Sequence, residues 1–408
     1  MKIAVCARAV RPRDGTSHFA MQLADLLARG GHDVTMVVEK FEALDGRSGR
    51  GPRSCIDVGQ ARCETKAGTV HRIARRFREE RFDVVFVCAG LPARYLEEAL
   101  GLSPDDTAVV LAVVSDRAFP CDPVVRSSAS WNVAVAISSR LVQSLQDRLP
   151  AKAVRLAATG VALPSEGGLA ELVPLTMPLR LLFVGRLLGR KNVLMLPRIL
   201  AACLRRGLPS TLTVCGYGPD REPLERACHE EGVAHLVKFP VLPRQVELYL
   251  AFRRHHVLLL TSSYGEGLGL VLLEGHGNGC VPVASRLVGV TDFAVEDGVT
   301  GMLAEAGNPE SFAERIAATS DPDRWQRLSD AAAARTRRLF SLDEMERDYA
   351  HLIREIGQGA CPLPLPRSEL PRPRFRPGSY LPPALSPVAK LYSRLRGPRP
   401  GTANPDPE

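Results

Sequence analysis

Two pairs of charged residues in the second half of this 408-residue chain have types and spacing that suit ligand chemistry. Arg186 and Lys191 share one glycine-containing segment, and Glu266 and Glu274 follow further on with seven residues between them. Arginine can bind two phosphate oxygens at once, and lysine adds a point charge. A carboxylate can accept two hydrogen bonds from a vicinal diol, each worth about 1.5–3 kcal/mol when sheltered. The pairs together suit a diphosphate flanked by diols.

The basic pair lies in a loop between an expected strand, 179–184, and an expected helix, 193–205. Gly185 permits a tight turn at the end of the strand. The N-terminus of the following helix favours an anion, and Arg186 and Lys191 add charge at that place. A basic loop before a helix is also a common solvated surface feature. This loop therefore indicates a phosphate site only in combination with a second signal.

The acidic pair supplies that second signal. Glu266 precedes Gly267 in a glycine-rich loop, where backbone can approach a ligand closely. The next helix is expected to begin near Gly269, so its first amides point back at the loop, and Glu274 follows one to two turns later. The alternative is that Glu266 is a helix N-terminal charge and Glu274 a surface residue. The glycines and the upstream basic loop favour ligand binding.

The rest of the chain predicts the elements that position these loops. Continuous Val/Ile/Leu/Ala runs, typical of parallel strands covered on both faces, alternate with helical segments. Strands are expected at 2–8, 33–39, 83–88, 108–114, 132–138, 153–158, 179–184, 211–215, 237–241, 257–260, 281–285 and 301–304. Helices are expected at 17–29, 66–80, 139–148, 193–205, 220–230, 244–252, 269–277, 309–320 and 322–356. Two such series in tandem predict an α/β fold of two facing doubly wound, Rossmann-like domains.

Composition sets the expected boundaries. We predict an N-terminal Rossmann-like domain over 1–163, a linker over 164–178 and a C-terminal Rossmann-like domain over 179–340. A C-terminal helix over 341–356 would pack back on the first domain. The last segment, 357–408, holds 13 of the 32 prolines and is expected to be a Pro/Arg-rich disordered tail.

Charge and cysteine usage exclude several classes of protein. The net charge is +8, of which +5 falls in 357–408, so the folded part is only mildly basic and nucleic-acid binding is not expected. The ten cysteines show no CxxC pattern, and no metal site is indicated. Without a signal peptide or an apolar run of about 18 residues, we expect a cytoplasmic protein. Peripheral contact with the inner membrane stays open.

In its second domain the sequence resembles the retaining glycosyltransferases of family 4, which have the GT-B fold. The resemblance rests on motifs in family order. They are FVGRL…KN at 183–192, CGYGP at 215–219, SSYGEGLGLVLLEG at 262–275, GCVPVAS at 279–285, GV at 289–290 and EDGVTGML at 296–303. The first domain matches more loosely, through DGTSHF at 14–19 and GGHDV at 30–34.

The resemblance implies a role for each matching residue. Arg186 and Lys191 would bind the donor diphosphate, Glu266 the hydroxyls of the donor sugar and Glu274 the ribose. Further donor-binding residues would be Gly15, Gly185, Gly216, Gly267, Leu268, Gly269, Leu270 and Val271. Arg186, Lys191 and Glu266 would be the catalytic group, with no metal and no cofactor besides the nucleotide-diphosphate sugar.

The acceptor side departs from the family. Where relatives have a second glycine after the first strand, this chain has Thr16. Where many relatives have a histidine after the strand at 108–114, this chain has Ser115 and Asp116. These residues and His18 are the acceptor-side candidates.

The resemblance thus implies a retaining transfer of sugar from a UDP- or GDP-sugar to a hydroxyl acceptor, in bacterial cell-surface polysaccharide, glycolipid or related glycoconjugate biosynthesis. The acceptor would be a glycan, a lipid-linked sugar or a small molecule. The missing histidine leaves open a non-catalytic sugar-nucleotide-binding subunit. An epimerase or phosphorylase on the same fold is a third alternative.

Overall fold

In a computed structural model of the chain, the placement of most residues can be described. The described residues are 1–7, 15–38, 54–57, 65–89, 99, 104, 106–114, 131–149, 153–157, 159–163, 172–241, 245–264 and 266–361. The chain forms two compact units. One comprises 1–111, 122–133 and 361–408, and the other comprises 112–121 and 134–360.

The first sheet has seven strands in the order β3-β2-β1-β4-β5-β6-β7. In this sheet β1 pairs with β2 and with β4, and β2 pairs with β3, in each case in parallel. The strands are β1 (Lys2–Ala7), β2 (Asp33–Val38), β3 (Ser54–Asp57), β4 (Val84–Ala89), β5 (Ala108–Val113), β6 (Val133–Ala136) and β7 (Ala153–Leu156). The helices of this part are α1 (Gly15–Arg29), α2 (Lys66–Glu80) and α5 (Ser139–Arg148).

The sequence predicted six of these strands and missed β3. Its four residues, SCID, contain a single branched apolar residue, Ile56, so they carry no apolar run. β3 lies at the edge of the sheet and pairs only with β2. An edge strand has one neighbour, so it can form without the apolar pattern that marks the central strands.

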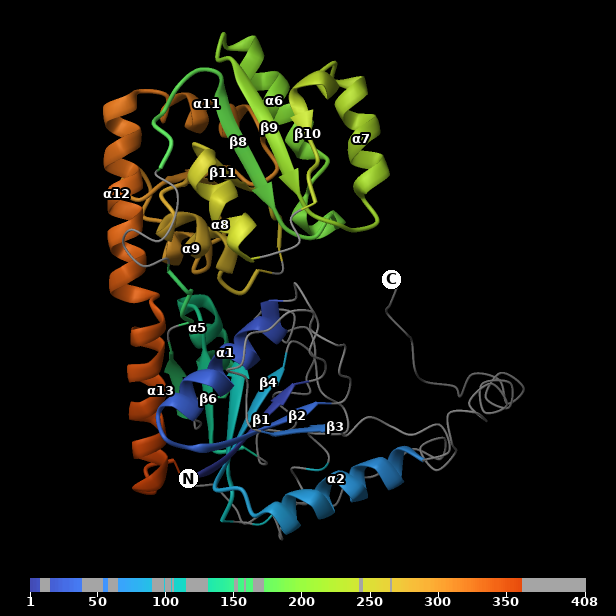
Figure 1. The fold of residues 1–408 in the computed structure, drawn as a ribbon, viewed down its shortest axis with the longest axis vertical. Coiled ribbons are helices and arrows are strands. Elements are labelled where there is room, and N and C mark those ends of the chain that lie inside the picture. Colours follow the sequence, from blue (N-terminus) through green and yellow to red (C-terminus); the bar gives the residue numbers. More distant parts are fainter. Residues whose placement is uncertain are drawn as a thin grey trace, which may run out of the picture. The chain divides into compact units, whose positions relative to one another are not determined.

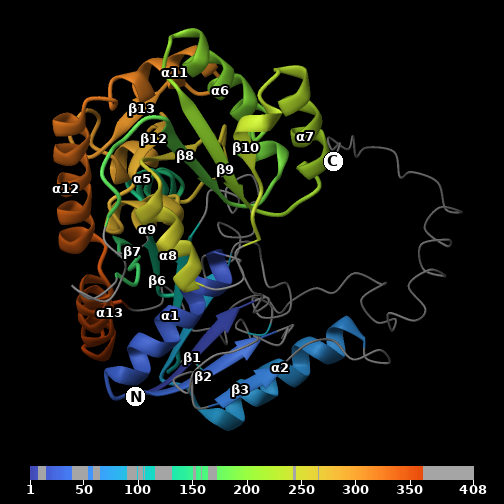
Figure 2. The same cartoon turned by 45° about the horizontal axis from the view of Figure 1, so that its top comes forward.

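The second sheet has six strands in the order β10-β9-β8-β11-β12-β13, and all its pairings are parallel. The strands are β8 (Leu179–Val184), β9 (Ser210–Cys215), β10 (Val237–Lys238), β11 (Val257–Leu260), β12 (Val281–Ser285) and β13 (Met302–Ala304). Figures 1 and 2 show β8, β9 and β10 side by side. The order reverses between β8 and β11, which is the switch point of a doubly wound fold.

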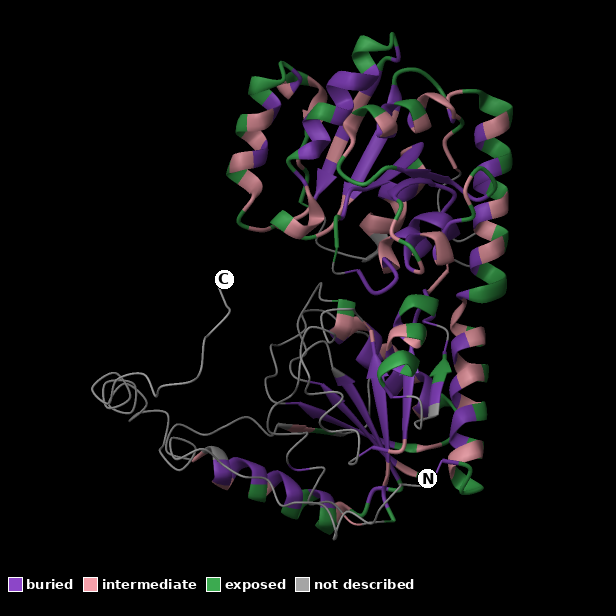
Figure 3. Cartoon of the chain, turned by 180° about the vertical axis from the view of Figure 1, so that it is seen from behind, coloured by how far each residue is buried: buried purple, intermediate pink, exposed green. Residues whose placement is uncertain are grey.

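Helices accompany the second sheet and continue to the end of the described chain. They are α6 (Met195–Arg205), α7 (Arg221–Glu230), α8 (Gln245–Arg254), α9 (Leu270–Gly277), α10 (Thr291–Ala294), α11 (Pro309–Ala317), α12 (Pro322–Leu339) and α13 (Leu342–Gly357). Two short 3₁₀ turns add η3 (Gly189–Lys191) and η4 (Ala234–Leu236). Figure 3 shows strands buried along their length and helices exposed on one side. The expected α/β fold with two parallel sheets is confirmed.

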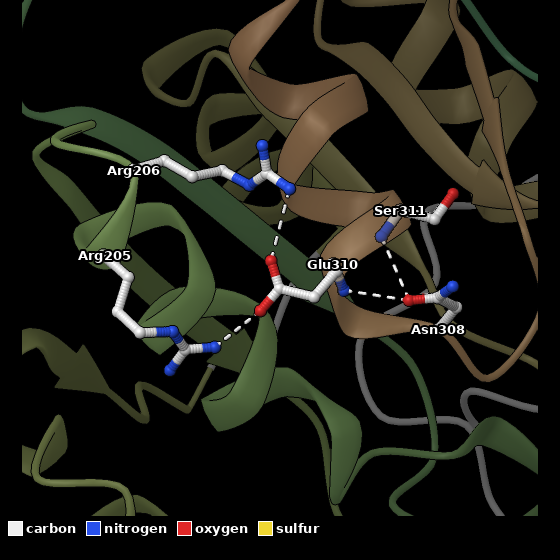
Figure 4. A network of polar contacts seen from close by, with 5 residues as sticks. All are labelled: Arg205, Arg206, Asn308, Glu310 and Ser311. Atoms are coloured by element: carbon white, nitrogen blue, oxygen red, sulfur yellow. Dashed lines mark hydrogen bonds and ion pairs between the residues drawn. The ribbon is translucent and has the colours of Figure 1, made fainter.

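Buried apolar residues of β8, β9, α6 and α11 form the core beneath the second sheet, with Phe183 and Phe312 among the largest. At the surface, Glu310 in the first turn of α11 accepts hydrogen bonds from Arg205 and Arg206 at the end of α6, at 2.7 and 3.3 Å (Figure 4). The bond from Arg205 lowers the pKa of Glu310. The Asn308 side chain caps α11. These contacts join α6 and α11, which pack against each other.

Most predicted helices begin or end within three residues of their predicted bounds, and two of the differences have a visible local cause. α6 begins at Met195 instead of 193, because the η3 turn and Asn192 come first. Asn192 has φ 49°, a left-handed value that asparagine tolerates better than most residues. The helical run at 322–356 divides into α12 and α13, since Ser341 caps α13 by accepting from Glu344 N at 3.2 Å. The S-x-x-E pattern is the sequence signal for that cap.

The predicted boundaries of the two domains and the linker stay predictions. Of the expected linker, 164–171 lie outside the described residues, and so does the Pro-rich tail from 362 onward.

Candidate donor-binding site

The loops after β8 and β11 meet at the carboxyl ends of these two adjacent strands, where open α/β sheets bind ligands. After β8, the amide of Gly185 donates to Cys215 O at 3.0 Å, and the amide of Leu187 donates to Tyr217 O at 2.8 Å. The loop after β9 is therefore held against the loop after β8.

That close approach depends on glycine. A Cβ on Gly216 would lie 2.0 Å from the backbone oxygen of Gly185, and one on Gly218 would lie 2.1 Å from that of Leu187. Gly218 was not among the predicted site residues, although its place in the CGYGP motif is the signal for it. The two glycines position backbone beside the basic loop.

The basic loop presents three cations. Arg186 is exposed, and among the described residues its guanidinium has no ionic or hydrogen-bonding partner. Arg190 and Lys191 are half-buried and lie in the η3 turn. The helix expected after this loop, at 193–205, is present as α6 and begins at Met195.

Two hydrogen bonds join the loop after β11 to this basic turn, and both are accepted by backbone oxygens of the turn. Thr261 donates its hydroxyl to Lys191 O at 2.7 Å, and the amide of Ser263 donates to Arg190 O at 3.0 Å. Thr261 is completely buried. These bonds fix the register of the two loops, so that residues further along the second loop reach the cations of the first.

Glu266, in the loop after β11, contacts the cations Lys191 and Arg190 of the loop after β8. It is 7% exposed, and its Oε1 accepts hydrogen bonds from Lys191 Nζ and, at 2.6 Å, from Ser262 Oγ. Arg190 Nη1 lies 3.7 Å from the same oxygen. Three cations (Arg186, Arg190 and Lys191) against one carboxylate leave two net positive charges at these loops, which matches a diphosphate. Lys191 and Glu266, which the sequence analysis assigned to the diphosphate and to the donor sugar, are thus in direct contact.

α9 begins one loop later with Gly269 as its N-cap, in the left-handed conformation at φ 77°. Gly267, Leu268 and Gly269 are buried, whereas Leu270, Val271 and Glu274 are half-buried. The free amides of the first turn of α9 suit a phosphate. Glu274 lies on the second turn of α9.

The acceptor-side candidates are described in part. Gly15 is exposed, and Thr16 and His18 are half-buried, all in the first turn of α1. Ser115 and Asp116 lie outside the described residues, as do 8–14. His276 on α9 is completely buried, and neither of its ring nitrogens has a hydrogen-bond partner among the described residues. Burial lowers the pKa of His276 to about 3.

Sequence reasoning missed Arg190 and Ser262. Arg190 adjoins Lys191, and Ser262 is the second residue after a buried strand, so both had a positional signal. Within the described ranges, no three His, Cys, Asp or Glu side chains form a group that could hold a metal ion. Likewise, the described helices include none with the length and apolar character needed to cross a bilayer.

Comparison with known proteins shows what the part of the chain around this site is similar to. The family model for glycosyl transferases group 1 matches residues 171–335. A D-inositol 3-phosphate glycosyltransferase of Corynebacterium efficiens is 31% identical over 191 residues, which are 45% of each chain. The match thus spans less than half the length of that curated relative.

Two solved structures share the fold over most of the chain. Sucrose-phosphate synthase from Thermosynechococcus elongatus has a TM-score of 0.71 at 18% identity, covering 88% of this chain and 99% of that one. An Anabaena protein in complex with UDP has a TM-score of 0.65 at 16% identity, covering 87% and 100%. The architecture is that of the GT-B glycosyltransferases. Residues 171–335, the segment that is similar to the family model for glycosyl transferases group 1, contain both Lys191 and Glu266.

Proposed function

We propose that the protein is a retaining glycosyltransferase that moves a sugar from a UDP- or GDP-sugar to a hydroxyl acceptor. The observation that carries the proposal is the contact of Lys191 and Glu266 at the switch point between β8 and β11. A cation for the diphosphate and a carboxylate for the sugar are adjacent there. The curated relative acts on D-inositol 3-phosphate by its name, and the Anabaena structure binds UDP. Both support a nucleotide donor and a hydroxyl acceptor.

The chemistry that these residues offer is mainly electrostatic. As the bond between sugar and diphosphate breaks, negative charge develops on the leaving oxygen. Arg186, Lys191 and the first amides of α9 stabilise that charge. Lys191 keeps two N–H donors for phosphate while the third bonds Glu266. The leaving oxygen itself can accept the acceptor's proton, so transfer on the same face of the sugar needs no protein base.

The role in polysaccharide or glycolipid biosynthesis, the cytoplasmic location and the metal-independent chemistry belong to the same proposal. The acceptor is a hydroxyl of a glycan, a lipid-linked sugar or a small polyol. Contact with a membrane surface is a further part of the proposal, for which the basic 357–408 segment is the only support.

The alternative is a non-catalytic subunit that binds nucleotide sugar, and the absence of the family's histidine near Ser115 favours it. A panel of UDP-, GDP-, ADP- and TDP-sugars in thermal unfolding identifies the donor, because a ligand at 100 times its dissociation constant adds about 2.7 kcal/mol of stability. The identified donor is then incubated with the protein. Release of nucleoside diphosphate is expected from the enzyme, and binding without release is expected from the subunit.

Stereochemistry tests the retaining assignment separately. Proton NMR of the early product, with an α-linked donor, is expected to show an α linkage. A β product would contradict retention while leaving the donor site in place.

A further inference from the structure

A buried serine lies behind the pair of Lys191 and Glu266. Ser262 is 0% exposed and follows β11 by two residues. Its hydroxyl donates to Glu266 Oε1 at 2.6 Å, on the same oxygen that Lys191 contacts and that Arg190 approaches to 3.7 Å. One carboxylate oxygen therefore meets three positively polarised groups.

The second oxygen of Glu266 is in a different situation. Among the described residues, every contact of this carboxylate falls on Oε1, and none falls on Oε2. A carboxylate held by one oxygen has lost most of its rotational freedom. Its other oxygen is then available, in a fixed place, to a ligand hydroxyl.

We infer that Ser262 is a positioning residue for the proposed transfer. Its hydroxyl, with Lys191 and Arg190, holds Glu266 in place through Oε1. The other oxygen, Oε2, then accepts a hydrogen bond from a hydroxyl of the donor sugar. This inference rests on the proposed function and goes beyond it by naming the residue that aims the sugar-binding carboxylate.

The neighbours of Ser262 explain why its hydroxyl is so well placed. Thr261 and Ser263, on either side, bond the backbone oxygens of Lys191 and Arg190 at 2.7 and 3.0 Å. The backbone on both sides of Ser262 is thus anchored to the loop that carries the cations. The side-chain hydroxyl of Ser262 donates to Glu266. Holding that carboxylate in place matters for catalysis, because a small displacement of a group that contacts the substrate lowers the rate strongly.

The test is a binding cycle on the full chain. Ser262→Ala is expected to weaken binding of the nucleotide sugar about tenfold, since hydrogen bonds to charged groups have that magnitude. Binding of the matching nucleoside diphosphate should change less than twofold, because Ser262 acts through the sugar-contacting carboxylate. In a Glu266→Ala background, Ser262→Ala should have no further effect on sugar-nucleotide binding.

The matched control is Ser329→Ala. Ser329, on α12, is also a buried serine, and its hydroxyl donates to Gly279 O at 2.8 Å. Loss of this hydroxyl should leave both affinities unchanged. Unchanged nucleotide-sugar binding in Ser262→Ala, or an equal loss in the Glu266→Ala background, would overturn the positioning role while donor binding by the wild type stands. A wild type that binds no nucleotide sugar would instead contradict the proposed function.

Discussion

At the scale of single residues, the site depends on a cation and a carboxylate that neutralise each other before any ligand binds. Lys191 and Glu266 were both predicted from residue type and from the glycines around them. The sequence could not show that their side chains touch, because 74 residues separate them and only the pairing of β8 with β11 brings them together. Ser262 was missed for another reason: it lies only four positions before Glu266, but the sequence does not show that its hydroxyl turns toward that carboxylate.

Arg186→Ala and Lys191→Ala are each expected to lower kcat/KM at least 100-fold, or about 2.7 kcal/mol, because each removes charge stabilisation of the leaving diphosphate. Steady-state assays with the identified donor measure the loss. Arg198→Ala, an exposed cation on α6, is the matched control and should retain full activity. Wild-type turnover in both site variants would refute the assignment of these two cations.

Gly216→Ala tests the close approach of the loops after β8 and β9. Its Cβ would lie 2.0 Å from Gly185 O, so the backbone must shift, at a cost of about 1–3 kcal/mol in the free energy of unfolding. Donor affinity should fall as well. Gly189→Ala is the control, since a Cβ there meets nothing within 4 Å. Urea unfolding of both variants compares them, and equal stability would count against the described loop packing.

At the scale of elements, apolar runs predicted the central strands closely because burial on both faces dictates their composition. β8, β11 and β12 have the predicted bounds. The elements that the sequence did not predict are determined by local hydrogen bonds or by a position at the edge of a sheet. η3 delays the start of α6, Ser341 divides the long C-terminal helix, and β3 has one neighbour only.

α9 carries a pH dependence that its sequence does not reveal. The pKa of His276 is about 3 in the folded protein because of burial, with Arg335 adding a smaller effect, against 6.5 for an ordinary histidine. The unfolded chain therefore binds one more proton between these values, and stability falls as pH decreases through 6.5 toward 3. Between pH 7 and pH 5, the free energy of unfolding of His276→Leu should fall less steeply than that of the wild type. The two slopes should differ by up to about 1.4 kcal/mol per pH unit. Identical slopes in urea titrations of variant and wild type would contradict the buried neutral ring.

At the scale of the whole molecule, two parallel sheets were predictable from the repeated alternation of strands and helices. The reversal of strand order at β8 then explains why the loops after β8 and β11 meet at one place. The acceptor side was harder to predict because its candidates, Thr16 and Ser115, replace the residues that relatives use. The donor side is consequently where the protein can be tested most sharply.

The most direct measurement is a calorimetric titration of the full chain with the nucleotide sugar and with its nucleoside diphosphate. Lys191→Ala should weaken both ligands at least tenfold, since both carry the diphosphate. Glu266→Gln should weaken the nucleotide sugar much more than the nucleoside diphosphate, since only the former carries the sugar. Equal weakening of both ligands by Glu266→Gln, or unchanged binding of both in Lys191→Ala, would contradict a donor site built on this pair.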